Sequence, residues 1–183
     1  MSSTTLDRGR DPLGDFYRTP AWCVQRLYEE VLTLPPTLDP CAGDGALLGA
    51  FCHDSWPLRG IELHPGRAAA ARAAGLDVTT GDGLAASWAG EDVLMNPPFA
   101  NAPAWIDKGL REAKSMVCLL RLGYLAGQKR KRVLWDMHPP LMVVVMSARP
   151  FPDSADYCWV VWDSMRWPTL CREREPSVRW ITR

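Results

Sequence analysis

Short apolar runs alternate along this chain with segments whose apolar residues fall at helical spacing. Four of these runs predict strands at Leu58–Leu63, Val93–Met95, Ser115–Leu120 and Leu141–Met146. Two further strands are predicted to lead into the glycine-containing stretches 38–48 and 78–84, and the apolar run Tyr157–Asp163 closes the pattern. From Thr37 to Met146 the strands alternate with helical segments, and no long Pro-, Gly- or Ser-rich linker or internal repeat interrupts them. This alternation predicts an α/β fold with a mostly parallel sheet and helices on both faces.

The first helix is predicted to begin beside Thr19 and Pro20. We expect Thr19 to cap this helix and Pro20 to occupy its first position, where a missing N–H is tolerated. Leu27, Tyr28 and Val31 then fall on one face of the helix. Because the N-terminus of a helix attracts anions, the same residues are candidates for a ligand contact.

Length and composition indicate one domain. The chain has 183 residues, of which 47% are apolar, so it can bury a core and is not disordered throughout. Residues 1–15 are polar and lack the apolar core of a signal peptide, so we expect a flexible segment there and a single domain over 16–183. No apolar run reaches the length of a membrane span, so we expect a cytoplasmic protein with no membrane partner.

The six cysteines lie at positions 23, 41, 52, 118, 158 and 171 and form no Cys-x-x-Cys pair. A zinc site is therefore not expected, and no other metal site is predicted. Cys118 and Cys158 lie in strand-like apolar runs, which favours reduced thiols in a cytoplasmic protein.

The segment Asn96-Pro97-Pro98-Phe99 follows a predicted strand and is the most informative part of the chain. Each proline fixes its own φ, lacks an N–H and holds the preceding residue extended. The Asn96 amide oxygen and the Pro97 carbonyl can therefore face one NH2 group at little ordering cost, and Phe99 offers a ring for stacking. Ligands of open α/β sheets bind at the carboxyl ends of the strands, where this loop is expected.

A second candidate ligand loop runs from Asp39 to Gly45, between a strand and an apolar helical segment. Its glycines allow the backbone to approach a ligand closely. Gly43 and Gly45 are followed by Gly49 and not by a glycine at position 48, so the spacing differs from the dinucleotide fingerprint. This difference disfavours an NAD-dependent oxidoreductase.

Acidic residues follow the next two predicted strands. Glu62 lies at about the position from which a carboxylate meets a ribose hydroxyl in nucleotide-binding folds. Asp82 and Gly83 follow the third strand, although Asp-Gly is also common turn chemistry.

The order of these elements resembles that of amino-group methyltransferases that use S-adenosylmethionine, and adenine-N6 DNA methyltransferases in particular. The resemblance covers residues 16–99 well and is looser over 115–163, where it is closest to short enzymes of phage type. It implies a Rossmann-like methyltransferase fold with an antiparallel strand pair near the C-terminus. It also implies that no large, separate target-recognition domain is present.

The resemblance assigns roles to individual residues. It implies that Asn96 and Pro97 accept hydrogen bonds from the target amine within the catalytic loop Asn96, Pro97, Pro98 and Phe99, and that Phe99 stacks on the base. Glu62 would bind the cofactor's ribose, and Leu63 and Asp82 its adenine. The full set that would contact S-adenosylmethionine is Tyr17, Thr19, Pro20, Asp39, Pro40, Cys41, Gly43, Gly45, Glu62, Leu63, Asp82, Gly83 and Asn96.

The formal net charge is zero, which is unlike a strongly basic DNA-binding domain. Positive charge is nevertheless concentrated at Lys129, Arg130, Lys131 and Arg132. These residues, with Arg149, are our candidates for phosphate contacts to DNA from which the target adenine is flipped out, by a monomer or a homodimer. A solvated charged face is the alternative interpretation of the block.

Three other functions remain open alongside adenine methylation. A protein glutamine-amide methyltransferase uses a similar loop, usually with Tyr in place of Phe99, but the Thr-Pro element and the basic block speak against it. An RNA base methyltransferase of the same fold is harder to separate. A catalytically silent cofactor-binding subunit is disfavoured by the intact loop.

Among the nine tryptophans, Trp159, Trp162 and Trp180 are predicted to pack in the core.

Overall fold

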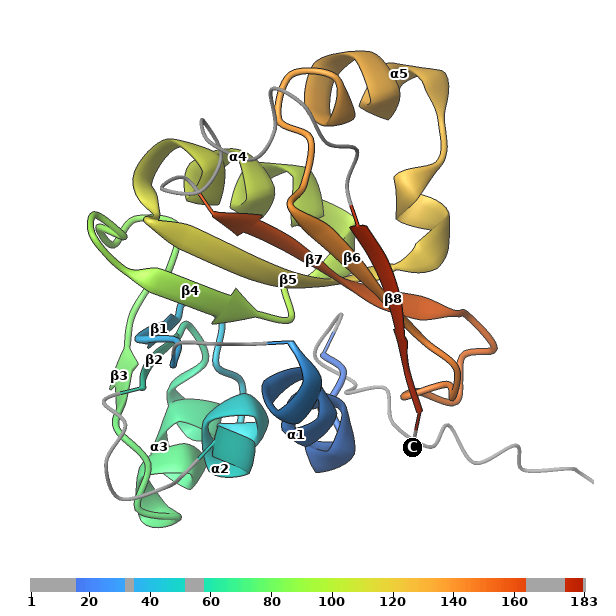
Figure 1. The fold of residues 1–183 in the computed structure, drawn as a ribbon. Helices are drawn as coiled ribbons and strands as arrows, with labels where there is room; N and C mark the ends of the chain where they lie inside the picture. Colours follow the sequence, from blue (N-terminus) through green and yellow to red (C-terminus); the bar gives the residue numbers. More distant parts are fainter. Residues whose placement is uncertain (1–15, 32–34, 52–57, 164–176, 183) are drawn as a thin grey trace, which may run out of the picture.

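The computed structural model describes residues 16–31, 35–51, 58–163 and 177–182. Within them, eight strands form one sheet in the order β3-β2-β1-β4-β5-β7-β6-β8 (Figure 1). The predicted flexible segment 1–15 lies outside the described residues.

The strands are β1 (Leu38–Asp39), β2 (Arg59–Glu62), β3 (Val78–Thr80), β4 (Asp92–Met95), β5 (Ser115–Arg121), β6 (Met142–Met146), β7 (Tyr157–Asp163) and β8 (Ser177–Ile181). The helices are α1 (Ala21–Glu30), α2 (Ala46–Phe51), α3 (Pro65–Ala73), α4 (Ala102–Glu112) and the short α5 (Gln128–Arg130). A π-helical turn, Lys131–Trp135, continues α5, and two 3-10 turns span Phe99–Asn101 and Leu122–Leu125. The four strands predicted with bounds, β2, β4, β5 and β6, lie within one residue of the prediction at each end. Strands are also present where they were predicted to lead into the stretches 38–48 and 78–84, and β7 coincides with the apolar run Tyr157–Asp163.

The sheet is parallel from β3 through β2, β1 and β4 to β5. Strand β7 runs antiparallel to both of its neighbours, β5 and β6. The prediction of a mostly parallel sheet with antiparallel pairing near the C-terminus is therefore confirmed. Strand β8, which was not predicted, pairs in parallel with β6 at the edge of the sheet.

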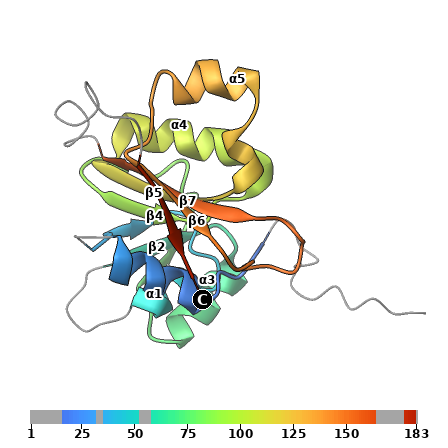
Figure 2. The ribbon, with the colours of Figure 1, turned by 45° about the vertical axis from the view of Figure 1, so that its right-hand side comes forward.

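Helices cover both faces of the sheet, with α1, α2 and α3 on one side and α4 and α5 on the other (Figures 1 and 2). Alternating residues of β4 supply both layers, as expected for a strand that is buried on two faces. Leu94 packs in the cluster that contains α1 and α2, whereas Val93 and Met95 pack with Trp105 and Ile106 of α4.

Two of the three tryptophans assigned to the core are buried. Trp159 and Trp162 of β7 have exposed fractions of 0% and 5%. The prediction for Trp180 is wrong, because this side chain lies on the edge strand β8 and is 64% exposed.

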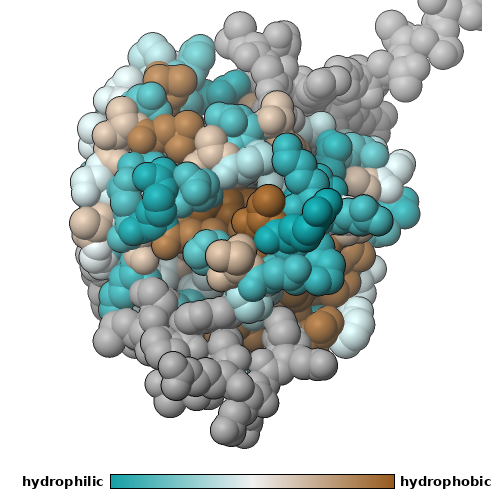
Figure 3. Space-filling model, turned by 90° about the horizontal axis from the view of Figure 1, so that it is seen from above, coloured by the Kyte–Doolittle hydropathy of each residue, from teal (hydrophilic) through white to brown (hydrophobic). Residues whose placement is uncertain are grey.

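The face of the molecule seen from above carries apolar side chains between hydrophilic ones (Figure 3). Val133 and Met137, which flank the end of the π-helical turn, are 62% and 66% exposed. In the described part of the chain, none of the helices combines the length and the apolar character needed to cross a membrane.

Candidate active site

A pocket opens at the carboxyl ends of the parallel strands β1, β2 and β4, beside the N-terminal segment. Every residue predicted to bind the cofactor or to act in catalysis lines this pocket, apart from Pro20, Gly43 and Gly45. The position agrees with the general rule for ligands of open α/β sheets. Across the described residues, no group of three or more His, Cys, Asp or Glu side chains is arranged to hold a metal ion.

The side-chain amide of Asn96 is fixed by two hydrogen bonds. Its Nδ2 donates to the Tyr17 carbonyl and to Thr19 Oγ1, each at 3.0 Å. Because both donors are used, the orientation of the amide is set and its oxygen is left as an acceptor. Asn96 Oδ1 is buried and has no partner within the described residues. A ligand with an N–H donor would satisfy it.

The predictions that Thr19 caps the helix and that Pro20 is its first residue are both wrong. Helix α1 begins at Ala21, with Pro20 in the capping position and no side-chain cap. Thr19 is 5% exposed, and its hydroxyl accepts the Asn96 bond instead. Thr19 therefore bonds to the side chain of Asn96, 77 residues away in sequence, and not to the backbone of the first helical turn.

The glycine loop is shaped by its contacts with Glu62. The Gly43 N–H donates to Glu62 Oε2 and the His64 N–H donates to Oε1, both at 2.8 Å. Gly43 and Gly45 have φ angles of 58° and 82°, a region that side chains rarely adopt. These two glycines therefore bend the loop around the pocket without lining it, and the Gly43 N–H helps to hold the buried Glu62 carboxylate that lines the pocket.

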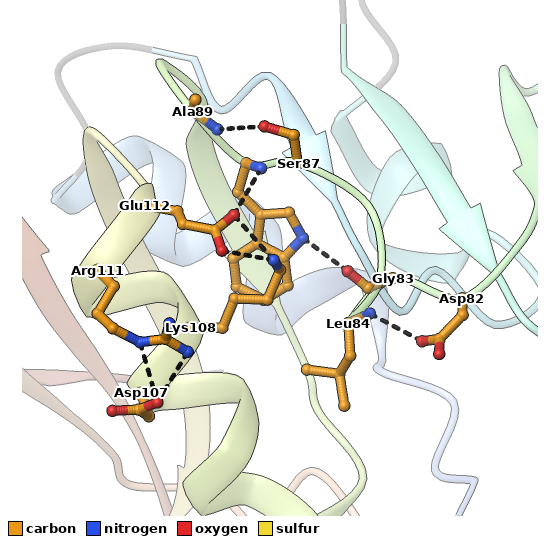
Figure 4. Close-up of polar contacts among 10 residues, drawn as sticks. Asp82, Gly83, Leu84, Ser87, Ala89, Asp107, Lys108, Arg111 and Glu112 are labelled. Carbon is orange, nitrogen blue, oxygen red and sulfur yellow. Dashed lines mark hydrogen bonds and ion pairs between the residues drawn. The ribbon is translucent and has the colours of Figure 1, made fainter.

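The turn after β3 is anchored to helix α4 through Trp88. The Trp88 indole N–H donates to the Gly83 carbonyl at 2.8 Å, and Glu112 of α4 accepts the Trp88 backbone N–H at 3.1 Å. Figure 4 shows the Asp82 carboxylate turning back to the Leu84 N–H, which is 2.9 Å away. Asp82 is thereby held at the pocket, and Leu63, which is 69% exposed, lies beside the pocket on the neighbouring strand end.

Asp39 is a fully buried carboxylic acid at the base of the pocket. Burial raises its pKa from 3.8 to about 7, although the Cys41 N–H, which donates to Oδ1 at 3.1 Å, opposes the shift. Asp39 Oδ2 is buried without a partner in the described residues. Burial, reinforced by the Asp39 charge, raises the pKa of the neighbouring Cys41 thiol well above its ordinary value. Cys41 is therefore a protonated thiol and not a nucleophile.

Phe99 lies in an aromatic cluster and not alone at the pocket mouth. Its ring centroid is 5.4 Å from that of Tyr17 and 5.6 Å from that of Tyr157. The Arg121 guanidinium carbon lies 5.1 Å from the Phe99 centroid and is held there by Asp153, at 2.9 Å. Burial raises the pKa of the Tyr157 hydroxyl, which donates to Asp153 at 2.6 Å. A ring that stacks on Phe99 would therefore meet a side chain that Tyr17, Tyr157 and Arg121 already contact.

Sequence reasoning missed several residues of the site. Phe16, Arg18, Asp44, Arg67 and Trp105 also line the pocket. Phe16 directly precedes Tyr17, which was predicted to contact the cofactor, so its aromatic side chain could have been included on that ground. No sequence signal identified Arg121, Asp153 and Tyr157, because only the pairing of β5 with β7 brings them together.

The pocket carries more acidic than basic groups. Its acids are Asp39, Asp44, Glu62 and Asp82, and its bases are Arg18 and Arg67. Arg18 is paired with Asp44 at 2.7 Å, and Arg67 lies 3.8 Å from Glu62. An excess of carboxylates favours a ligand with positive charge.

The basic residues predicted to contact phosphate are found in different settings. Lys129 and Arg132 are exposed on α5 and the following turn, as the sequence predicts for this block. Lys131 is paired with Asp136 at 2.7 Å, and Arg149 with Asp156 at 3.1 Å. Arg130 folds onto the ring of Tyr124, at 4.7 Å from its centroid.

No protein-family model and no curated protein matches this chain. Solved structures do resemble it. A protein from Listeria monocytogenes, proposed to be a class I S-adenosylmethionine-dependent methyltransferase, superimposes with a TM-score of 0.67 at 16% identity, over 96% of this chain and 68% of its own.

Two further structures are similar. A protein from Pyrococcus horikoshii, proposed to be an RNA methyltransferase, has a TM-score of 0.62 at 15% identity, over 84% of this chain and 90% of its own. A glycopeptide N-methyltransferase complexed with S-adenosylmethionine has a TM-score of 0.60 at 12% identity, over 84% of this chain and 99% of its own. The chain therefore has the Rossmann-like methyltransferase fold predicted for it.

Gly83 is expected to tolerate no side chain, because a Cβ there would collide with the Pro40 carbonyl oxygen. Gly83→Ala should lower the free energy of unfolding by about 2–3 kcal/mol through backbone displacement. Gly81→Ala is the matched control, since its Cβ would meet only Ile61 at an ordinary 3.6 Å. Urea denaturation of both variants tests this, and equal losses would contradict the close approach.

Asp39 should make stability fall with rising pH. Its folded-state pKa of about 7 lies above the ordinary 3.8, so the folded chain binds this proton more tightly than the unfolded chain. Stability is then greatest below about pH 4 and declines until about pH 7, by up to about 4 kcal/mol. Asp39→Asn, which stays neutral, should remove this decline in urea denaturation at pH 5 and pH 8. An unchanged difference between the two pH values would argue against a buried, neutral Asp39.

Proposed function

We propose that this protein transfers a methyl group from S-adenosylmethionine to the exocyclic N6 amine of adenine in DNA. The observation that carries the proposal is the buried Asn96 Oδ1, which has no partner in the described residues and belongs to a pocket-lining side chain fixed by Tyr17 and Thr19. It is an acceptor for an N–H donor that the described residues do not supply.

The proposed cofactor fits the donors and acceptors of the pocket. S-adenosylmethionine carries a sulfonium and an ammonium group, which suit the acid-rich lining. Asp39 Oδ2, without a partner in the described residues, would accept from the ammonium group, and the Glu62 carboxylate would accept from the ribose hydroxyls. Leu63 and Asp82 would meet the adenine. NAD, with its anionic pyrophosphate, suits this lining less well.

The catalytic loop would act on the nucleophile. An aryl amine is a weak nucleophile because its lone pair is delocalised into the ring. Hydrogen bonds from its two N–H groups to Asn96 Oδ1 and the Pro97 carbonyl would favour a tetrahedral nitrogen and localise that pair. When bound, the cofactor supplies an electrophilic sulfonium methyl group. The amine nitrogen gains the methyl group as the carbon–sulfur bond breaks, and its excess proton then leaves to solvent, so positioning is the main requirement.

Other methyl-transfer chemistry receives less support. Carbon methylation of a pyrimidine through a thiolate needs an activated cysteine, and the thiol in this pocket, Cys41, has a raised pKa. Glutamine-amide methylation remains the alternative among amines. The aromatic cluster around Phe99 and the adjacent arginines favour a flat base over an aliphatic amide.

The cofactor is tested by calorimetry. We expect S-adenosylmethionine to bind and NAD not to bind, and Glu62→Ala to weaken S-adenosylmethionine by about 1–3 kcal/mol through lost charge-assisted hydrogen bonds. Asp107→Ala, a substitution in an exposed ion pair on α4, is a control that should leave binding unchanged. Tighter binding of NAD than of S-adenosylmethionine would overturn the proposal.

Asn96 and Thr19 test the chemistry. After incubation with cofactor and either DNA or RNA, mass spectrometry of the digested nucleosides should detect N6-methyladenine from DNA. Asn96→Ala should keep the cofactor affinity and lose most methyl transfer, because its acceptor matters most in the transition state.

Thr19→Val, which removes one of the two bonds that orient Asn96, should lower turnover by about tenfold, and Thr19→Ser should restore it. If Asn96→Ala retains near wild-type turnover, the residue is structural only. Methylation of RNA alone would replace DNA by RNA as the substrate.

A further inference from the structure

Phe99 lines a second cavity, on the α4–α5 side of the catalytic loop. This cavity of about 240 Å³ is otherwise lined by Ala102, Leu120, Arg121, Gly123, Tyr124 and Arg130. It combines two aromatic rings with two guanidinium groups. The catalytic loop therefore forms a wall between this cavity and the acid-rich pocket, since Phe99 lines both.

The chain from residue 123 to residue 130 wraps around the Arg130 guanidinium. Arg130 Nε donates to the Ala126 carbonyl at 2.9 Å, and Nη2 donates to the Gly123 carbonyl at 3.5 Å. Gly127, at φ 108°, turns the backbone so that the side chain folds back over Tyr124. The guanidinium is thus held in place, and three of its five N–H donors are not used in these bonds.

The two arginines of the cavity differ in how their charge is balanced. Arg121 is paired with Asp153 at 2.9 Å and covers Phe99. Arg130 contacts no carboxylate within the described residues; its partners are backbone carbonyls and an aromatic ring. The cavity therefore retains a positive charge that an anion could neutralise.

We infer that this cavity is the substrate subsite of the catalytic loop and that Arg130 binds the phosphate next to the methylated base. The inference rests on the proposed function and narrows the predicted phosphate contacts to one residue, Arg130, and one phosphate, the one next to the methylated base. A planar guanidinium with free donors matches phosphate oxygens, and the rings of Phe99 and Tyr124 match a flat base. A nucleotide supplies both groups, whereas an acidic peptide supplies only the anion.

The test uses short single-stranded oligonucleotides with one adenine, in DNA and in RNA form. One phosphate, on the 5′ or the 3′ side of the adenine, is replaced by an uncharged methylphosphonate. Binding is measured by fluorescence anisotropy with saturating S-adenosylhomocysteine, for the wild type, Arg130→Gln and Arg132→Gln. Arg132 is the matched control, because it is exposed on the same short helical segment and does not line the cavity.

We expect one of the two replacements to weaken binding to the wild type by about tenfold or more, the loss of a charge-assisted hydrogen bond. Arg130→Gln should bind every oligonucleotide with the weaker affinity that the wild type shows for the modified one. Its affinity should not change when the phosphate is replaced. Arg132→Gln should remain sensitive to it. Arg130→Lys, which keeps the charge, should recover part of the affinity, and thermal unfolding checks that each variant folds.

Equal sensitivity of Arg130→Gln and the wild type to the replacement overturns the inference. So does insensitivity of the wild type to both replacements, or binding of acidic peptides in preference to oligonucleotides. The outcome is separable from that of the proposed function. Adenine methylation with no role for Arg130 would remove only the inference, whereas Arg130-dependent oligonucleotide binding without methyl transfer would remove only the proposed reaction.

Discussion

The site depends on the two hydrogen bonds that fix the Asn96 amide. Their acceptors, the Tyr17 carbonyl and Thr19 Oγ1, precede α1, while Asn96 follows β4, so the bonds join segments 79 and 77 residues apart. They hold the segment that precedes α1 against the end of β4. Both amide donors are used and the amide oxygen is buried without a partner in the described residues, which costs about 1–3 kcal/mol for an unsatisfied acceptor. Such a group in a native structure calls for an explanation, and a catalytic role is one.

Asp39 also carries a buried acceptor oxygen without a partner in the described residues, and its carboxyl group can titrate. Its carboxyl is fully buried, one oxygen has no partner in the described residues, and burial raises its pKa to about 7. A cationic ligand group beside Oδ2 would favour the ionised form and recover part of the burial cost. Three residues of the pocket, Asp39, Asp44 and Asn96, each carry a buried oxygen without a partner in the described residues. The two carboxylate oxygens suit a cation and the amide oxygen suits a neutral amine, which matches the two partners of the proposed reaction.

The features that could be predicted from the sequence are those that depend on residues close together in the chain. Strand runs and the glycine and Asn-Pro-Pro-Phe loops depend on nearby residues, and these elements were found where expected. What failed depends on distant partners. Thr19 was read as a cap because its neighbours favour a helix start, yet its hydroxyl bonds Asn96. Trp180 was assigned to the core because it is apolar, but its strand lies at an edge of the sheet. Arg121 contacts Phe99 only through long-range strand pairing.

If Arg130 binds phosphate, Phe99 separates two regions of opposite charge. Four acids and two arginines lie on the cofactor side, and Arg121, which is paired with Asp153, and Arg130 lie on the other. A cationic cofactor is repelled by the arginines and an anionic substrate by the acids, so each ligand is directed to its own side before any specific contact forms. The two ligands would then meet at Phe99, which lines both sites, and the target amine would have to reach past this ring to Asn96 on the cofactor side. In this arrangement the charge distribution selects the ligands, and the fixed amide sets the geometry of transfer.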